Sequence, residues 1–164
     1  MLQIDESSPA NAKPLDYLKK RYNKIVKDYW KDAPLVASPQ DYPDPYWRLG
    51  CHPEVVERIR DGLGKALPKD GRCLVCGTPA LLHSSTGAFL AFAIGASYVL
   101  RIPKEDIKQA LVLGWKEQKP WAGGKVMNTS QELGEGWLFG RYREDEITWL
   151  RKICQLLEVD RQGK

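Results

Sequence analysis

The sequence contains few of the residues and motifs on which enzyme chemistry usually depends. Only two histidines are present, His52 and His83, so a base that could activate a serine or cysteine nucleophile is scarce. There is no GxSxG elbow, HExxH pair, Walker loop or GxGxxG motif after a predicted strand. These absences favour a protein without catalytic chemistry.

Long apolar runs are also absent. No run approaches the roughly 20 residues that a helix needs to cross a bilayer. Residues 1–13 include acids but no apolar segment of the kind found in signal peptides. We therefore expect a cytoplasmic protein with no membrane-spanning segment. The four cysteines then favour free thiols, a metal site or a redox pair over structural disulfides.

The chain has no strong excess of charge of one sign, because its formal net charge is only +4. Residues 14–31 account for this charge, with six cations against two acids. This basic segment could contact RNA or another anionic surface, but a solvated helix face explains it more simply. The rest of the chain is close to neutral, so we expect no nucleic-acid partner.

The length of 164 residues fits one domain. We predict a mobile tail over residues 1–13, a helix with a proline-rich connector over 14–49, and a single α+β domain over 50–164. The N-terminal helix is amphipathic, because apolar residues recur at steps of three and four: Leu15, Leu18, Tyr22, Ile25, Val26 and Tyr29. This stripe fits docking on its own domain or on a second subunit of a homo-oligomer.

Residues 71–101 predict an antiparallel meander. Short apolar runs alternate with glycine-rich turns, which places strands near residues 72–76, 80–83, 88–93 and 97–102. Further short strands are expected near 125–127 and 137–142, and helices after Pro53, Pro103 and Glu144. The predicted fold class is α+β, an antiparallel sheet of about four to six strands packed against helices.

Cys73 and Cys76 have the spacing that lets two thiolates bind one zinc ion. Cys51, His52 and His83 could supply the remaining ligands. The same pair could instead be a redox dithiol, although the residues after Cys73 look like a strand and offer no helix N-terminus to lower a thiol pKa. In a straight strand the two side chains would point to opposite faces. The simplest interpretation is two small buried core residues.

The segment from Trp115 to Lys125 is the predicted recognition surface. It combines two indoles, three lysines and a Gly-Gly pair in one irregular stretch. Indoles next to cations suit stacking on a planar ligand or anchoring in a partner. The candidate binding residues are Trp115, Lys116, Glu117, Lys119 and Trp121, together with Arg141. Alternatively, both indoles fold back and cap the core.

Three short motifs follow one another in the second half of the chain. They are Leu100-Arg101-Ile102-Pro103 at a helix start, Gly114-Trp115-Lys116-Glu117 followed by Pro120, and the run Gly140-Arg141-Tyr142-Arg143-Glu144-Asp145-Glu146 entering the last helix. In this order, residues 78–157 resemble the luciferase-like domain family of uncharacterised proteins. That family has a histidine directly before the proline, where this chain has Lys119, so no role is carried over for it. The resemblance implies a fold and no specific activity.

These observations predict a non-catalytic binding or interaction module that needs no cofactor and recognises a small ligand or a protein partner. The alternative is a zinc-binding protein or a thiol-based enzyme centred on Cys73, Cys76 and His83.

Overall fold

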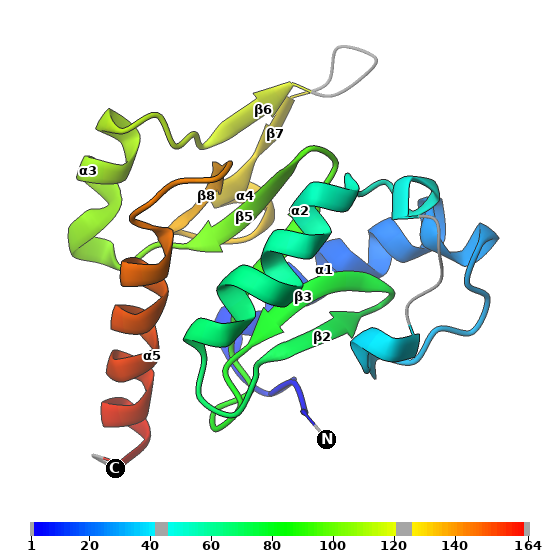
Figure 1. Cartoon of the computed structure of the whole chain (residues 1–164), viewed down its shortest axis with the longest axis horizontal. Helices are drawn as coiled ribbons and strands as arrows, with labels where there is room; N and C mark the ends of the chain where they lie inside the picture. The colour runs from blue at the N-terminus through cyan, green and yellow to red at the C-terminus, as the bar shows by residue number, and fades with distance from the viewer. Residues whose placement is uncertain (1, 42–45, 121–125, 163–164) are drawn as a thin grey trace.

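Figure 1 shows the chain as a computed structural model, which describes residues 2–41, 46–120 and 126–162. Its centre is a six-stranded antiparallel sheet in the order β1-β2-β3-β4-β5-β8. The strands are β1 (Val36–Ala37), β2 (Arg72–Val75), β3 (Thr78–Leu82), β4 (Phe89–Ile94), β5 (Ser97–Arg101) and β8 (Trp137–Gly140). A separate pair joins β6 (Gln118–Pro120) to β7 (Val126–Asn128). The predicted α+β class with an antiparallel meander is confirmed.

Helices cover both faces of this sheet, with α1 behind it and α2 and α5 in front in the view of Figure 1. Their bounds are α1 (Pro9–Lys24), α2 (Pro53–Glu57), α3 (Ile107–Val112), α4 (Thr129–Glu132) and α5 (Glu146–Gln162). After α2 the chain continues through a π-helical turn, Arg58–Leu63, and a 3-10 turn, Gly64–Ala66. None of the helices in the described part of the chain has the length and apolarity required to cross a membrane.

The β2–β3 hairpin turns through Cys76 and Gly77, which both have positive φ, +49° and +74°. Two consecutive residues of positive φ are the mark of a type I′ turn, whose twist matches that of the flanking strands. The cysteine is unusual there, because a side chain disfavours this conformation. The turn also carries Cys76 out of the regular strand alternation.

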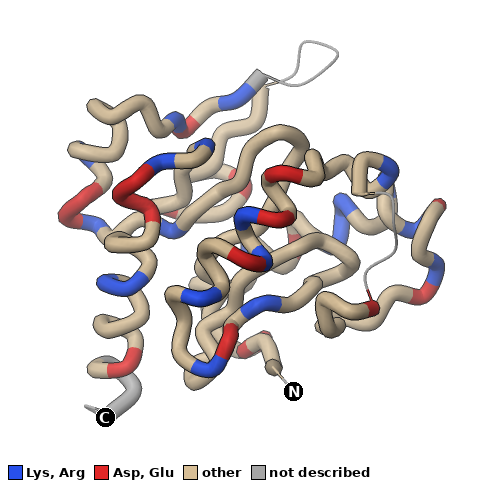
Figure 2. The backbone as a smooth tube through the Cα atoms, viewed as in Figure 1, with Lys and Arg blue, Asp and Glu red and all other residues tan. Residues whose placement is uncertain are grey.

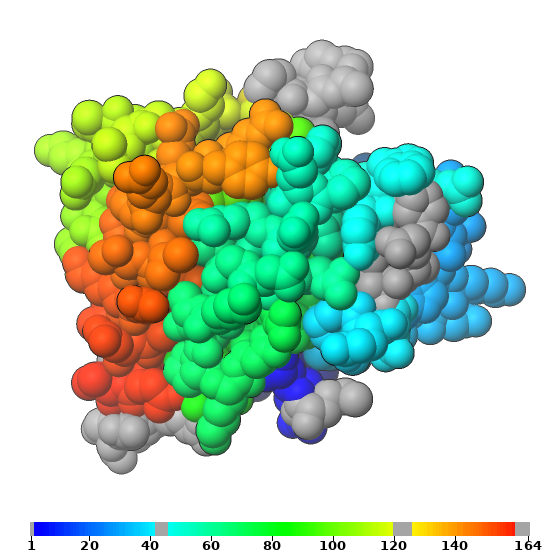
Figure 3. Space-filling view, viewed as in Figure 1, coloured from blue at the N-terminus to red at the C-terminus, as the bar shows by residue number. Residues whose placement is uncertain are grey.

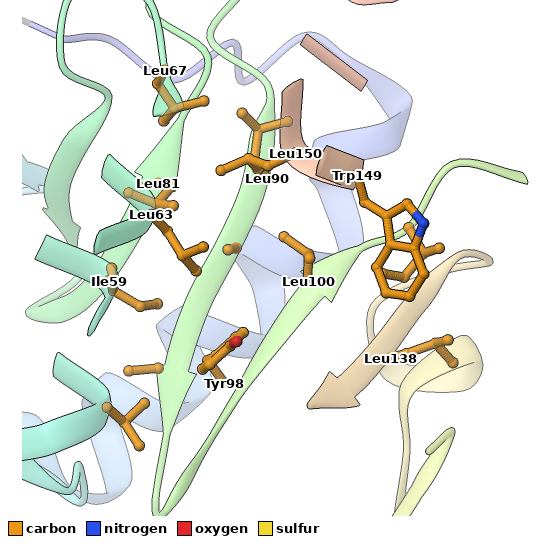
Figure 4. Packing of buried hydrophobic residues seen from close by; sticks show 14 of the residues in the cluster. Ile59, Leu63, Leu67, Leu81, Leu90, Tyr98, Leu100, Leu138, Trp149 and Leu150 are labelled. Atoms are coloured by element: carbon orange, nitrogen blue, oxygen red, sulfur yellow. The ribbon is translucent and has the colours of Figure 1, made fainter. Parts of the chain in front are cut away.

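The front face of the sheet packs against α2, the π-helical turn and α5 (Figure 4). Leu81, Leu90, Tyr98 and Leu100 point forward from neighbouring strands and are fully buried. They meet Ile59 and Leu63 of the π-helical turn and Trp149 and Leu150 of α5. The alternation of side chains along each strand sends the intervening residues to the other face.

The back face packs against α1. Leu15 and Leu18 of the predicted apolar stripe lie in one cluster with Phe89, Phe92 and Val99 of the sheet. The helix therefore docks on its own domain, which is one of the two partners expected for it. Association of a second subunit through this helix stays a prediction.

The N-terminal segment differs from the predicted tail over residues 1–13. The helix begins at Pro9, where a proline fits because the first-turn N–H needs no intrahelical partner. The backbone N–H of Asp5 donates to the carbonyl of Gly87 at 3.0 Å, and the Asn11 side chain bonds both Gly87 and Phe89. These contacts attach residues 5–11 to the start of β4.

Candidate functional site

The predicted metal ligands do not form a site in the structure. Cys73 of β2 and Cys76 of the following turn are both buried in the cluster on the back face. None of the four cysteines is in a disulfide bond, and all four are buried. Within residues 2–41, 46–120 and 126–162, no three His, Cys, Asp or Glu side chains lie together in a way that could hold a metal ion. Cys51, His52 and His83 thus do not complete a ligand set with the pair.

The thiols also lack the environment of a reactive dithiol. Burial raises the pKa of Cys73 to about 12 and raises the pKa of Cys76 as well. A nucleophilic or redox-active thiol needs a lowered pKa, because the thiolate is the reactive form. The surroundings of both cysteines fit a packing role.

Both histidines cap local backbone turns. The imidazole of His83 is fully buried, and its Nδ1 accepts hydrogen bonds from the backbone N–H groups of residues 85–86 at 3.2 and 3.1 Å. Its Nε2 lies 3.4 Å from a carboxylate oxygen of Glu158. His52 is exposed and caps α2, where its Nδ1 accepts from the N–H of Glu54 at 3.2 Å.

Trp115 lies in the core and is not a surface recognition residue, which corrects the sequence-based assignment. Its side chain is only 2% exposed and packs edge-to-face against Tyr98 and Trp149, with ring centroids 6.0 and 5.6 Å away. Gly140 leaves room for the indole, because a Cβ there would lie 2.0 Å from its ring. Folding back onto the core, the alternative interpretation, is correct for this residue. Trp121 lies outside the described residues.

The charged candidates of the same segment line a groove at the edge of the sheet, next to β8. Its volume is about 240 Å³, and four cationic side chains line it: Lys116, Lys119, Arg141 and Arg143. The remaining surface comes from Ser97 and Gln118, the ring of Phe139 and two glycines. None of the described residues that line it is acidic. The cationic groove, defined by these nine residues, is the candidate functional site.

Two separate segments bring the four cations together, residues 116–119 and residues 141–143. The backbones of Lys116 and Phe139 form two hydrogen bonds, with N···O distances of 3.0 and 2.7 Å. These bonds hold the chain before β6 next to β8. Arg141 and Arg143 follow directly after β8. Figure 2 shows cations on both segments, and Figure 3 shows the loop after β8 (orange) between the α3–β6 region (yellow-green) and α2 (blue-green).

Lys119 is partly buried, whereas Lys116 and Arg141 are exposed. Its Nζ donates to Ser97 Oγ at 2.8 Å and lies 5.7 Å from the centre of the Phe139 ring. Desolvation lowers the pKa of Lys119, and the positive charge of Arg141 lowers it further. The two cations therefore repel each other in the absence of an anion between them.

The guanidinium group of Arg143 contains one buried N–H donor that has no acceptor among the described residues. This donor is Nε, while Nη2 lies 3.4 Å from the Gly114 carbonyl. Glu146 is buried, pairs with Arg58, and accepts the backbone N–H of Arg143 at 3.2 Å, so its contact with Arg143 is through the backbone. Burial raises the pKa of Glu146, and the ion pair with Arg58 opposes that rise.

Three of the groove cations have no counter-charge of their own. In the described part of the chain, no carboxylate lies within ion-pair distance of Lys116, Arg141 or Arg143. Glu117, a predicted binding residue, is exposed and is not part of the lining; its backbone carbonyl accepts the N–H of Thr129 at 2.8 Å. The groove thus contains positive charges that the described carboxylates do not neutralise.

The sequence did not indicate three of the groove residues. Ser97 starts β5, Gln118 starts β6, and Arg143 was assigned only to an Arg-plus-acid run before α5. They are 21 to 46 positions apart from one another, so no local pattern links the three, although Gln118 lies within the predicted recognition segment of residues 115–125. Only the pairing of β5 with β8 and of Lys116 with Phe139 brings them together.

Comparison with protein-family models, with curated proteins and with solved structures finds no match for this chain. The resemblance of residues 78–157 to the luciferase-like domain family therefore stays a prediction. The functional argument rests on the geometry of the cationic groove.

Proposed function

We propose that this protein is a non-catalytic binding module that holds an anionic ligand or partner group in the cationic groove. The observation that carries the proposal is the convergence of Lys116, Lys119, Arg141 and Arg143 on one groove whose described lining contains no acid. Cations held close together without counter-charges raise the local concentration of anions and bind them by charge-assisted hydrogen bonds.

Binding rather than catalysis fits the content of the groove. Among the described residues that line it there is no histidine, cysteine or carboxylate, so none of them is a general base of the usual kinds. Ser97, which contributes a hydroxyl to this described lining, accepts a hydrogen bond from Lys119 at its Oγ. Four cysteines outside disulfide bonds agree with the reducing cytoplasmic compartment that we propose for the protein.

Thermal unfolding in the presence of simple anions tests this function. The probes are inorganic phosphate, sulfate and citrate, each at matched ionic strength. A ligand that binds only the folded state at about ten times its Kd stabilises it by about 1.4 kcal/mol, which corresponds to a Tm rise of about 3 °C for a chain of this size.

The double variant Lys116→Gln/Arg141→Gln should lose this rise. The control is Lys108→Gln/Arg151→Gln, which removes the same charge from exposed positions outside the lining and should keep it. Excluded salts stabilise any folded protein, so an equal rise in both double variants would count as a solvent effect and would contradict binding in the groove.

A further inference from the structure

The arrangement of charge in the groove indicates which anion it accepts. Two arginines and two lysines face a space of about 240 Å³. Among the described residues, no carboxylate lies within ion-pair distance of Lys116, Arg141 or Arg143, so a ligand with one negative charge would leave at least two of these three cations uncompensated. Burial lowers the pKa of Lys119, and repulsion from the charge of Arg141 lowers it further. A group with two negative charges reduces this repulsion more effectively.

The number and origin of the cations favour a tetrahedral group over a planar one. A single arginine fork can satisfy both oxygens of a carboxylate. Here four cationic residues line one groove, two within residues 116–119 and two in the loop after β8. A phosphate monoester has three terminal oxygens and about two charges at neutral pH, and each oxygen can reach a different cation.

The size of the groove limits how much of a ligand it can hold. Pockets for drug-sized ligands span roughly 300 to 1,000 Å³, and this one is smaller, at about 240 Å³. Ser97 and Gln118, which carry a hydroxyl and an amide, line the same space. We infer that the cationic groove binds the phosphate monoester group of a small molecule, with the remainder of that molecule outside the groove.

This inference rests on the proposed anion-binding function, and an NMR titration of the full ¹⁵N-labelled chain separates the two. The probes are methyl phosphate, a monoester with two charges; dimethyl phosphate, a diester with one; and malonate, a dicarboxylate with two. Methyl phosphate should shift the amide signals of residues 114–119 and 139–143. Its Kd should be lower than that of either other probe by about tenfold, the ratio expected for the loss of one charge-assisted contact.

Two variants show where the phosphate binds. Arg141→Gln should weaken methyl phosphate binding by about tenfold, while Arg151→Gln, on the exposed side of α5, should leave the Kd unchanged. Amide dispersion in the free spectra verifies that both variants are folded. If malonate binds as tightly as methyl phosphate and Arg141→Gln weakens both, the phosphate inference is overturned and the anion-binding function stands. If no probe shifts the groove signals, both are overturned.

Discussion

At the scale of single residues, burial decides roles that residue type alone suggests wrongly. Arg21 belongs to the basic run of the N-terminal helix, where a solvated position is expected, yet its side chain is buried. It donates to the Thr78 hydroxyl at 2.8 Å and to the Leu49 carbonyl, and lies 3.4 Å from the Cys51 sulfur. One cation thus joins α1, the connector and β3. In the sequence, its phase on the helix and its guanidinium group distinguish it from its lysine neighbours.

Cys73 gives a prediction at this scale. Burial raises the pKa of its thiol from 9.0 to about 12, so between these values the unfolded chain loses the proton and the folded chain keeps it. The free energy of unfolding should therefore fall as pH rises from 9 towards 12, and should be unaffected by this group below pH 9. Urea denaturation at several pH values between 8 and 11 measures the effect.

The matched variant is Cys73→Ala, which removes this proton while keeping a small apolar side chain. The variant should be less stable overall, because the packing of the sulfur atom is lost. Above pH 9, however, its free energy of unfolding should fall less steeply with pH than that of the unmodified protein. The two slopes should differ by up to about 1.4 kcal/mol per pH unit. Identical slopes for the two proteins would show that the folded thiol ionises normally, and would return Cys73 to consideration as a reactive group.

At the scale of elements, the meander was predictable because its strands are apolar and separated by turn residues. The predicted strands near 72–76 and 97–102 match β2 and β5 to within one residue. Three short elements were not predicted: β1, β6 and α4 contain only two to four residues each. Such segments are too short to show a period of 2.0 or 3.6, and pairing with distant residues forms them.

The contact between Gly140 of β8 and the indole of Trp115 provides a test at this scale. Gly140→Ala would place a Cβ 2.0 Å from the ring, so the indole must move, at an expected cost of about 2 kcal/mol in the free energy of unfolding. Urea denaturation measures this cost. In a Trp115→Phe background the smaller ring leaves more room, so the same substitution should cost at least about 0.5 kcal/mol less. Equal costs in the two backgrounds would contradict steric coupling between β8 and the chain after α3.

At the scale of the whole molecule, both faces of the sheet depend on helices from distant parts of the chain. Residues 50–164, predicted as the domain, supply five of the six strands of the sheet and the helices of its front face, while β1 comes from the preceding connector. The back face is covered by α1, whose Leu15 and Leu18 pack on it. The predicted N-terminal helix is therefore part of the same hydrophobic structure as the predicted domain.

A truncated chain tests this dependence. Residues 50–164 alone would expose the apolar back face, so we expect loss of cooperative urea unfolding and of dispersed amide signals, with association of the apolar surfaces. The control chain, residues 9–164, keeps α1 and removes the backbone hydrogen bond of Asp5 to Gly87, and it should fold. Cooperative unfolding of residues 50–164 would show that the domain is independent of α1.

The sequence by itself determined the α+β class, the meander, the positions of the longer helices and the charged residues Lys116, Lys119 and Arg141 as binding candidates, because these depend on local periodicity and composition. Only the tertiary structure decided that Trp115 is in the core, that the cysteines and histidines stay apart, and that Ser97 and Arg143 join the groove. Burial and proximity between distant residues are properties of strand pairing and packing. A local pattern of residues contains neither.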